Sequence, residues 1–195
     1  MAYSLHSLYP QAFLREARIH EAAPANRGLS RWLREHCKNY LPSGYFPDHS
    51  FGSFVGPLRN EDLEKQTFAD GAFDLVVHLD VLEHLFEPFV ALREMSRTLR
   101  PGGKCLFSTP TMWDRMETAR AARLLADGAT EIIGVPEYHG NPQDPSGGSL
   151  VTWRYGYDLP ALIMRETDFD VEVRRYQSRK AAAMGVMTEI YILSK

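Results

Sequence analysis

The clearest pattern in the chain is an apolar run at residues 73–79, followed by a helical repeat of apolar positions at residues 88–99. A short run rich in Leu and Val, opened by a Gly turn, is typical of a strand covered on both faces in a parallel sheet. The apolar positions of the second segment recur at spacings that predict a helix packed on that sheet: Val90, Leu92, Met95 and Leu99. Pro-Gly-Gly at 101–103 is expected to end the helix and turn the chain into a strand at 104–110.

The same reading of apolar spacing and turn residues predicts the remaining elements. Further strands are expected at residues 17–24, 39–46, 58–63, 171–176 and 189–194, which brings the strand count to seven. Helices are expected at residues 4–17, where Pro10 marks a break or an early start, and at residues 30–37, 112–126 and 158–166, with Asp158 as the N-cap of the last one. Residues 48–57 are expected to form a loop, and residues 177–188 a connector.

Composition narrows the class of protein. A chain of 195 residues suits one domain with its own core. The net charge of -3 predicts no nucleic-acid partner. No apolar run approaches the ~20 residues that span a bilayer, and no secretory leader is recognisable, so no membrane is expected. Cys37 and Cys105 lack metal-type spacing and are expected to be reduced thiols in a cytoplasmic protein.

Three sequence motifs resemble those of a known family: residues 73–77, residues 80–85 (Asp-Val-Leu-Glu-His-Leu) and residues 99–104 (Leu-Arg-Pro-Gly-Gly-Lys). They resemble the central segment of class I S-adenosylmethionine-dependent methyltransferases of the type-11 branch, and the likeness covers residues 17–110 well. The resemblance implies an α/β fold, a Rossmann-like three-layer sandwich with a seven-stranded, mostly parallel sheet whose last strand is antiparallel. It implies one domain over residues 1–195, with an N-terminal helix at 1–17 and an acceptor-pocket insertion at 111–157.

The resemblance also places the methionine part of S-adenosylmethionine, the expected cofactor, beside the turn after the first strand. In the family an acidic residue ends this strand and a glycine-rich turn follows. Glu21 matches the acid, but Ala22 and Ala23 stand in the turn and only Gly28 remains as a glycine. Positive φ angles are therefore expected at Gly28 and at Asn26. Either this variant turn still binds the cofactor, or the fold has lost that function.

The adenosine part is expected at the ends of the next strands. In the family an Asp accepts the adenine amino group, and Asp62 and Leu63 match that position, with Glu61 beside them; the alternative is a solvated acidic turn. The family's ribose-binding acid has no counterpart, since Gly44-Tyr45-Phe46 occupies its position. Tyr45 either stacks on adenine or is a half-buried strand-end aromatic. Two residues at the end of the central strand, Leu79 and Asp80, complete the predicted cofactor cleft.

Asp80, Glu83 and His84 follow the central strand at the edge where open α/β sheets bind ligands. A similar acid–Glu–His set holds a divalent metal in some methyltransferases, and such ligands suit Mg²⁺ or Mn²⁺. Glu-His at this place is also widespread in type-11 proteins without a metal, where the acid or the His can cap the next helix, and we predict no metal here. His84 is a candidate general base, since the ordinary pKa of a histidine lies near neutrality.

The Gly- and Pro-rich stretch after the fifth strand is where methyltransferases of this class build the acceptor pocket. Within it Glu137, Tyr138 and His139 offer a carboxylate, a phenol and an imidazole together. Tyr138 and His139, with His84, are the predicted catalytic residues. The alternative is an ordered loop whose histidine bonds the backbone.

The function predicted from the sequence is transfer of a methyl group to a small polar acceptor, at oxygen, by a bacterial enzyme acting on sugars or secondary metabolites. The alternatives are a non-catalytic module that serves as scaffold or partner subunit, and a cyclase or isomerase on the same fold. A homodimer is left open.

Overall fold

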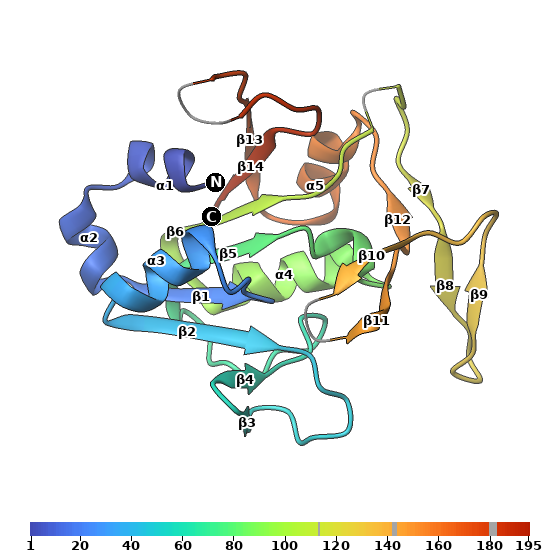
Figure 1. The fold of residues 1–195 in the computed structure, drawn as a ribbon, viewed down its shortest axis with the longest axis horizontal. Helices are drawn as coiled ribbons and strands as arrows, with labels where there is room; N and C mark the ends of the chain where they lie inside the picture. The colour runs from blue at the N-terminus through green and yellow to red at the C-terminus, as the bar shows by residue number, and fades with distance from the viewer. Residues whose placement is uncertain (113, 142–143, 180–182) are drawn as a thin grey trace.

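The structure, a computed structural model, describes residues 1–112, 114–141, 144–179 and 183–195, without the side chains of 144–146. Its centre is an eight-stranded sheet with the order β13-β14-β6-β5-β1-β2-β4-β3 (Figure 1). The strands of this sheet are β1 (Arg18–Ala22), β2 (Asn39–Gly44), β3 (Phe54–Val55), β4 (Leu58–Asn60), β5 (Phe73–Leu79), β6 (Leu99–Ser108), β13 (Asp170–Arg175) and β14 (Glu189–Ser194). The predicted α/β Rossmann-like sandwich is confirmed.

Parallel pairing joins the five strands from β4 to β6, through β2, β1 and β5. The last strand, β14, runs antiparallel to both of its neighbours, β6 and β13, as expected. The structure adds an eighth strand: β3 lies in the segment predicted as a loop and pairs antiparallel with β4. Parallel pairing of the central strands brings their carboxyl ends to one edge, where ligands bind in open α/β sheets.

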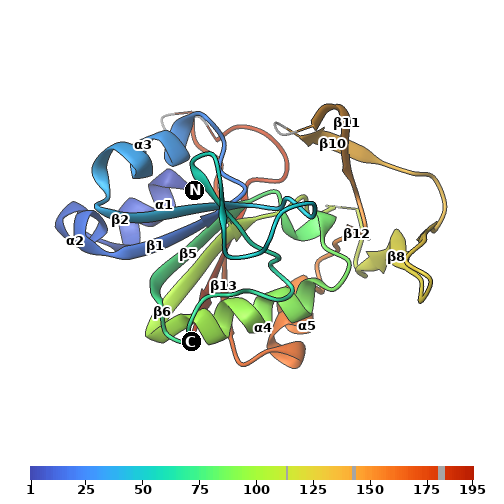
Figure 2. The same cartoon turned by 90° about the horizontal axis from the view of Figure 1, so that it is seen from below.

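Helices cover both faces of the sheet and make three layers (Figure 2). On one face lie α1 (Ala2–Leu8), α2 (Gln11–Glu16) and α3 (Gly28–His36); on the other lie α4 (Pro88–Thr98) and α5 (Leu159–Glu166). The N-terminal segment predicted as helical is two helices, and Pro10 marks the break between them, because it forces Tyr9 into an extended backbone. Leu5 and Leu14 are fully buried in the core beside Leu33, so this segment is a packing element. Among the described residues no helix is long and apolar enough to cross a bilayer.

The Pro-Gly-Gly segment ends no helix and lies inside a strand, not before it. β6 begins at Leu99, and its pairing with β5 jumps from Leu99 to Lys104, so residues 100–103 form an irregularity within the strand. Gly103 is required here, since a Cβ would lie 2.9 Å from the carbonyl oxygen of Arg100.

The helix predicted at residues 112–126 is wrong. This stretch contains β7 (Ala119–Arg120) and β8 (Ala122–Leu124), which pair with β12 (Trp153–Arg154) and β9 (Thr130–Ile132). The backbone N–H groups of Ala121 and Ala122 both donate to the carbonyl of Thr152. These hydrogen bonds to a residue distant in sequence stabilise an extended backbone, although the spacing of apolar residues weakly favours a helix. Trp113, placed beside that helix, lies outside the described residues.

The rest of the insertion is a second hairpin, β10 (Tyr138–Asn141) with β11 (Asp144–Leu150). It stands over the carboxyl edge of the sheet, while β8 and β9 extend away from the body of the molecule (Figure 1). The insertion thus places its second hairpin at the edge where the predicted site residues gather.

Two fully buried histidines in the sheet, His20 and His78, make the free energy of unfolding depend on pH. Burial, followed by the charge of His20, lowers the pKa of His78 to about 3, and both of its ring nitrogens lack a hydrogen-bond partner among the described residues. Below about pH 6.5 an unfolded histidine takes up a proton that folded His78 refuses. The free energy of unfolding must therefore fall as the pH drops from about 6.5 towards 3.

We expect His78→Phe to reduce this loss, because a phenyl ring stacks on Phe107 as the imidazole does and carries no proton. Between pH 7 and pH 4.5 the parent should lose about 2–3 kcal/mol more than the variant, measured by denaturant unfolding. Replacing His49, which is exposed, should leave the pH dependence of the parent unchanged. Equal pH dependence in His78→Phe and the parent would contradict this account.

Candidate functional site

The turn between β1 and α3 is open at the carboxyl edge of the sheet. Ala23 and Gly28 have left-handed backbone, with φ values of 50° and 56°. Positive φ was expected at Gly28 and at Asn26; the structure places it at Ala23 in place of Asn26. This conformation costs a residue with a Cβ about 1–2 kcal/mol. Both residues are exposed, and nothing lies within 4 Å of a Cβ built at Gly28. The chain's own side chains leave this turn free.

Glu21 lies beneath the turn and is buried. Its Oε1 accepts a hydrogen bond from Ser30 (2.7 Å), and its Oε2 accepts one from the Tyr40 hydroxyl (2.6 Å). Burial raises the pKa of Glu21, and these two hydrogen bonds oppose that shift. The carboxylate therefore ties β1 to α3 and β2 and braces the turn. Its predicted contact with the cofactor ammonium group stays a prediction.

The predicted adenosine side contains an exposed aromatic ring beside acidic groups. Tyr45 follows β2, is 58% exposed and stacks on Phe51 at 6.0 Å. Burial of part of the ring, then the negative charges of Asp62 and Glu64, raise the pKa of Tyr45. Asp62 is half-buried and accepts the backbone N–H of Glu64 through Oδ1 (2.9 Å), and Leu63 beside it is buried. A ring and a carboxylate thus stand together at the edge.

Glu61 belongs to the core. It is buried, its Oε1 accepts hydrogen bonds from Arg59 and from the Thr67 hydroxyl (2.6 Å each), and its Oε2 accepts the Thr67 backbone N–H (2.8 Å). These contacts favour a structural role over the predicted contact with the cofactor.

Backbone strain recurs at the end of the central strand. Asp80 is exposed and left-handed (φ 52°), and its Oδ1 accepts the Ser108 hydroxyl at 2.9 Å, while Leu79 before it is half-buried. Among the described residues only Ala23, Asp80 and Met187 are non-glycine residues with positive φ. Ala23 and Asp80 follow adjacent strands, since β1 pairs with β5. Such strain gathers at functional sites, and here it marks one edge.

The short 3-10 helix η1 (Leu82–His84) places Glu83 in the interior next to this edge. Glu83 is 1% exposed; its Oε2 accepts the Thr109 hydroxyl at 2.9 Å, and its Oε1 has no hydrogen-bond partner among the described residues. Burial raises the pKa of Glu83 to about 7, and the Thr109 hydrogen bond and His139 partly offset that shift.

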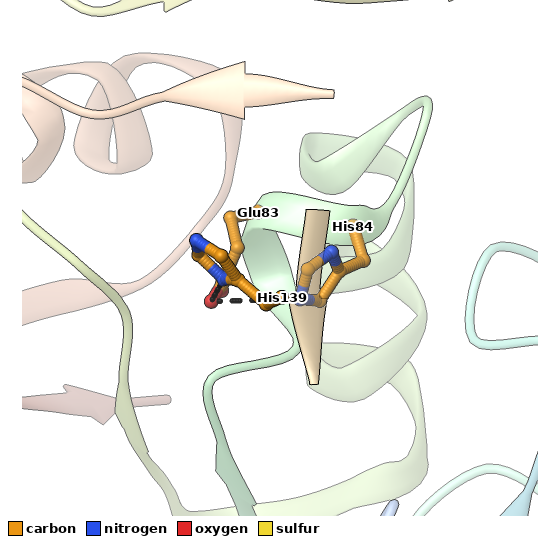
Figure 3. Close-up of side chains that lie close together, drawn as sticks. All are labelled: Glu83, His84 and His139. Carbon is orange, nitrogen blue, oxygen red and sulfur yellow. Dashed lines mark ion pairs between the residues drawn. The ribbon is translucent and has the colours of Figure 1, made fainter. Parts of the chain in front are cut away.

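Two histidines from distant segments face this oxygen (Figure 3). His84 Nε2 lies 3.7 Å, and His139 Nδ1 3.5 Å, from Glu83 Oε1. The other ring nitrogen of each is engaged: His84 Nδ1 with the Leu150 carbonyl at 2.8 Å, and His139 Nε2 with Glu137 Oε1 at 3.3 Å. The rings are nearly perpendicular, with centroids 5.2 Å apart. Burial lowers the pKa of His84, and the Leu150 hydrogen bond opposes it.

The structure therefore brings together His84 and His139, two of the predicted catalytic residues. Tyr138 precedes His139 on β10 and is 56% exposed. Glu83 was considered only as a ligand together with Asp80, and its burial between the two imidazoles was missed. The sequence did show that Glu83 is next to His84. It could not show that His139 lies beside them, because that contact depends on the position of the β10–β11 hairpin.

A set of hydrogen bonds from residues 152–155 holds the segment after β5. Thr152 donates twice to the Glu83 carbonyl, through its backbone N–H (2.7 Å) and its hydroxyl (3.0 Å), and the hydroxyl also lies 2.6 Å from the Leu85 carbonyl. The Tyr155 hydroxyl donates to the Leu82 carbonyl (2.9 Å). We call these contacts the Thr152 clamp. It fixes η1, and with it Glu83 and His84.

Comparisons with known proteins agree with this fold. Residues 51–107 match the family described as a methyltransferase domain. Demethylmenaquinone methyltransferase from Mycolicibacterium vanbaalenii is 45% identical over 53 residues, 26% of this chain and 23% of that protein. The tRNA U34 carboxymethyltransferase of Syntrophotalea carbinolica is 40% identical over 53 residues, 27% of this chain and 15% of that protein. The chain thus spans less than a quarter of the length of these curated relatives.

Solved structures extend the likeness to the whole chain. An S-adenosylmethionine-dependent methyltransferase from Mesorhizobium loti has a TM-score of 0.63 at 17% identity, covering 99% of this chain and 96% of that one. The 1,6-didemethyltoxoflavin-N1-methyltransferase of Burkholderia thailandensis, with bound S-adenosylhomocysteine, has a TM-score of 0.50 at 16% identity, covering 95% and 76%. At these identities the likeness shows the fold.

The fold is that of S-adenosylmethionine-dependent methyltransferases of known structure, and residues 51–107, less than a third of the chain, match the methyltransferase-domain family, in agreement with the resemblance stated from the sequence.

We expect Thr152→Val to lower the free energy of unfolding by about 1–3 kcal/mol, because the Leu85 carbonyl loses the hydroxyl 2.6 Å away and the Glu83 carbonyl keeps only the Thr152 backbone N–H. Thr152→Ser keeps the hydroxyl and should retain most of that stability. Denaturant unfolding of both variants measures the difference. If Ser and Val destabilise equally, the hydroxyl does not hold η1.

Proposed function

We propose that this chain transfers a methyl group from S-adenosylmethionine to an oxygen of a small polar acceptor, such as a sugar or a secondary metabolite. The observation that carries the proposal is the open edge formed by the left-handed turn at Ala23–Gly28 and the exposed Tyr45 beside Asp62. These groups follow β1, β2 and β4, which are neighbours in the sheet. We expect an elongated nucleoside ligand to lie across them.

The residues present fit the two ends of the cofactor. The open space above Gly28 and the N-terminus of α3, which no side chain caps, suit the methionine carboxylate. Tyr45 offers a face for adenine, Asp62 an acceptor for its amino group, and Leu63 an apolar contact. Leu79 and Asp80 border the same edge at the end of β5. These assignments, with Ala22 and Ala23 as the turn backbone, are part of the proposal.

The cofactor supplies a methyl group already activated on a sulfonium, so the protein mainly aligns the partners and excludes water. The acceptor is placed under the β10–β11 hairpin, beside His84, Tyr138 and His139. His84 donates through Nδ1 to the Leu150 carbonyl, which leaves Nε2 as the unprotonated nitrogen. Such a nitrogen can receive the proton that an acceptor hydroxyl gives up.

A non-catalytic module acting as scaffold or partner subunit is the second candidate. It is favoured by the internal hydrogen bonds that engage both oxygens of Glu21 and by the single glycine in the first turn. The two free, buried cysteines fit the cytoplasmic, bacterial setting expected for either candidate. A homodimer stays a prediction.

Calorimetric titration with S-adenosylhomocysteine separates the two candidates. We expect micromolar binding in the parent, and Asp62→Ala should weaken it about 10- to 100-fold, the effect of losing one charge-assisted hydrogen bond of about 1.5–3 kcal/mol. Asp62→Asn keeps an oxygen for the Glu64 N–H and separates loss of the turn from loss of the charge.

Asp48→Ala, a change at an exposed residue outside the predicted cleft, should bind like the parent. Absence of binding in the parent would favour the scaffold, whereas unchanged affinity in Asp62→Ala would remove Asp62 from the adenine site.

A further inference from the structure

We propose that Glu83, His84 and His139 bind a divalent transition-metal ion of the zinc type. They offer one carboxylate oxygen and two imidazole nitrogens that all lie within 4.8 Å of one another (Figure 3). The ligands come from η1 and from β10, so the site forms only when the hairpin docks on the edge of the sheet. This departs from our expectation from the sequence, in which no metal was predicted and the set considered contained Asp80 in place of His139.

The first argument is the state of Glu83 Oε1. It is buried and unpaired, and the two imidazole nitrogens lie 3.5 and 3.7 Å away, too far for hydrogen bonds. A buried acceptor without a partner costs about 1–3 kcal/mol. Ligand atoms around a tetrahedral zinc ion with bonds of about 2.0–2.1 Å lie about 3.3–3.5 Å apart. The two separations from Glu83 Oε1 are close to these values, and the two imidazole nitrogens, which lie within 4.8 Å of one another, would approach each other as the ion binds.

The second argument is that each ligand is held by a partner that leaves one atom free towards the common centre. His84 Nδ1 bonds the Leu150 carbonyl, and His139 Nε2 bonds Glu137 Oε1, which directs the lone pairs of His84 Nε2 and His139 Nδ1 to Glu83. Metal-binding histidines in proteins typically donate their second nitrogen to such a carbonyl or carboxylate. The Thr109 hydroxyl likewise donates to Glu83 Oε2 and leaves Oε1 available to the ion.

The donor set decides the class of ion. Two imidazoles and one carboxylate suit Zn²⁺, Fe²⁺, Co²⁺ or Ni²⁺, whereas Mg²⁺ and Ca²⁺ prefer oxygen ligands throughout. Three protein ligands leave a coordination position for water or for an oxygen of the acceptor. With the ion bound, His84 Nε2 would be a ligand and not a base, and the ion would take over the task of easing loss of the acceptor proton. That last role rests on the proposed methyl transfer; the ion site itself does not.

The test is titration of the tag-free, chelator-treated full chain with Zn²⁺, with metal content per chain read by mass spectrometry. We expect one ion per chain with a Kd below about 1 μM, no competition from millimolar Mg²⁺, and visible absorption from bound Co²⁺. Glu83→Gln and His139→Ala should each weaken Zn²⁺ binding at least about 100-fold. Glu137→Ala, which frees the second nitrogen of His139, should weaken it about 10- to 100-fold.

His49→Ala removes an exposed histidine away from the cluster and should bind Zn²⁺ like the parent. Denaturant unfolding of each variant shows whether it is folded. Glu83→Gln keeps the size and shape of the side chain, whereas His139→Ala removes the ring. The proposal is overturned if the parent binds no ion tighter than about 100 μM, or if Glu83→Gln and His139→Ala, both folded, keep the parent's affinity. Titration without nucleoside keeps this result separate from S-adenosylhomocysteine binding, whose failure would overturn the proposed methyl transfer alone.

Discussion

The site depends on how the backbone carbonyls after β5 find donors. The chain leaves the sheet at Leu79 and passes through the 3-10 helix η1 before α4 begins, so several carbonyls have no regular partner. Buried backbone groups must be paired, and the donors come from the far end of the insertion: Thr152, Trp153 and Tyr155 reach the carbonyls of residues 82–86. The hydrogen bond between His84 Nδ1 and the Leu150 carbonyl ties the end of β11 to the same segment. The segment that carries Glu83 and His84 and the hairpin that carries His139 therefore hold each other in position.

Residues 17–110 could be predicted from the sequence because their signals are local. β5 is a buried apolar run and α4 has helical spacing, and both lie at the predicted positions. The acids Asp62 and Asp80 were placed at the correct sheet edge because parallel strands align their carboxyl ends. The missed features inside this region, the edge strand β3 and the irregular start of β6, depend on pairing with a neighbouring strand, which no single segment encodes.

The insertion resisted prediction for a physical reason. Ala121 and Ala122 are extended because their N–H groups reach the Thr152 carbonyl, and Met116, on the supposed helix face, is 72% exposed. Apolar spacing is informative only where a face is buried. The same limit explains Glu83: the sequence showed an acid next to His84 but could not show that a hairpin would set His139 against it.

Left-handed backbone at two non-glycine residues and one buried carboxylate oxygen without a hydrogen bond meet at this edge. Ala23 and Asp80 keep left-handed backbone where a glycine would be relaxed, and Glu83 keeps a buried oxygen without a hydrogen bond. Each feature costs on the order of 1–3 kcal/mol, against a typical total stability of about 5–15 kcal/mol. Such costs persist only where surrounding contacts enforce them. Here the backbone N–H of Ala23 donates to the Ser43 carbonyl and that of Asp80 to the Ser108 carbonyl, which holds the first two, and the Thr152 clamp holds the segment that carries the third. A rigid edge that holds unfavourable groups in place is preorganised for ligands that relieve them.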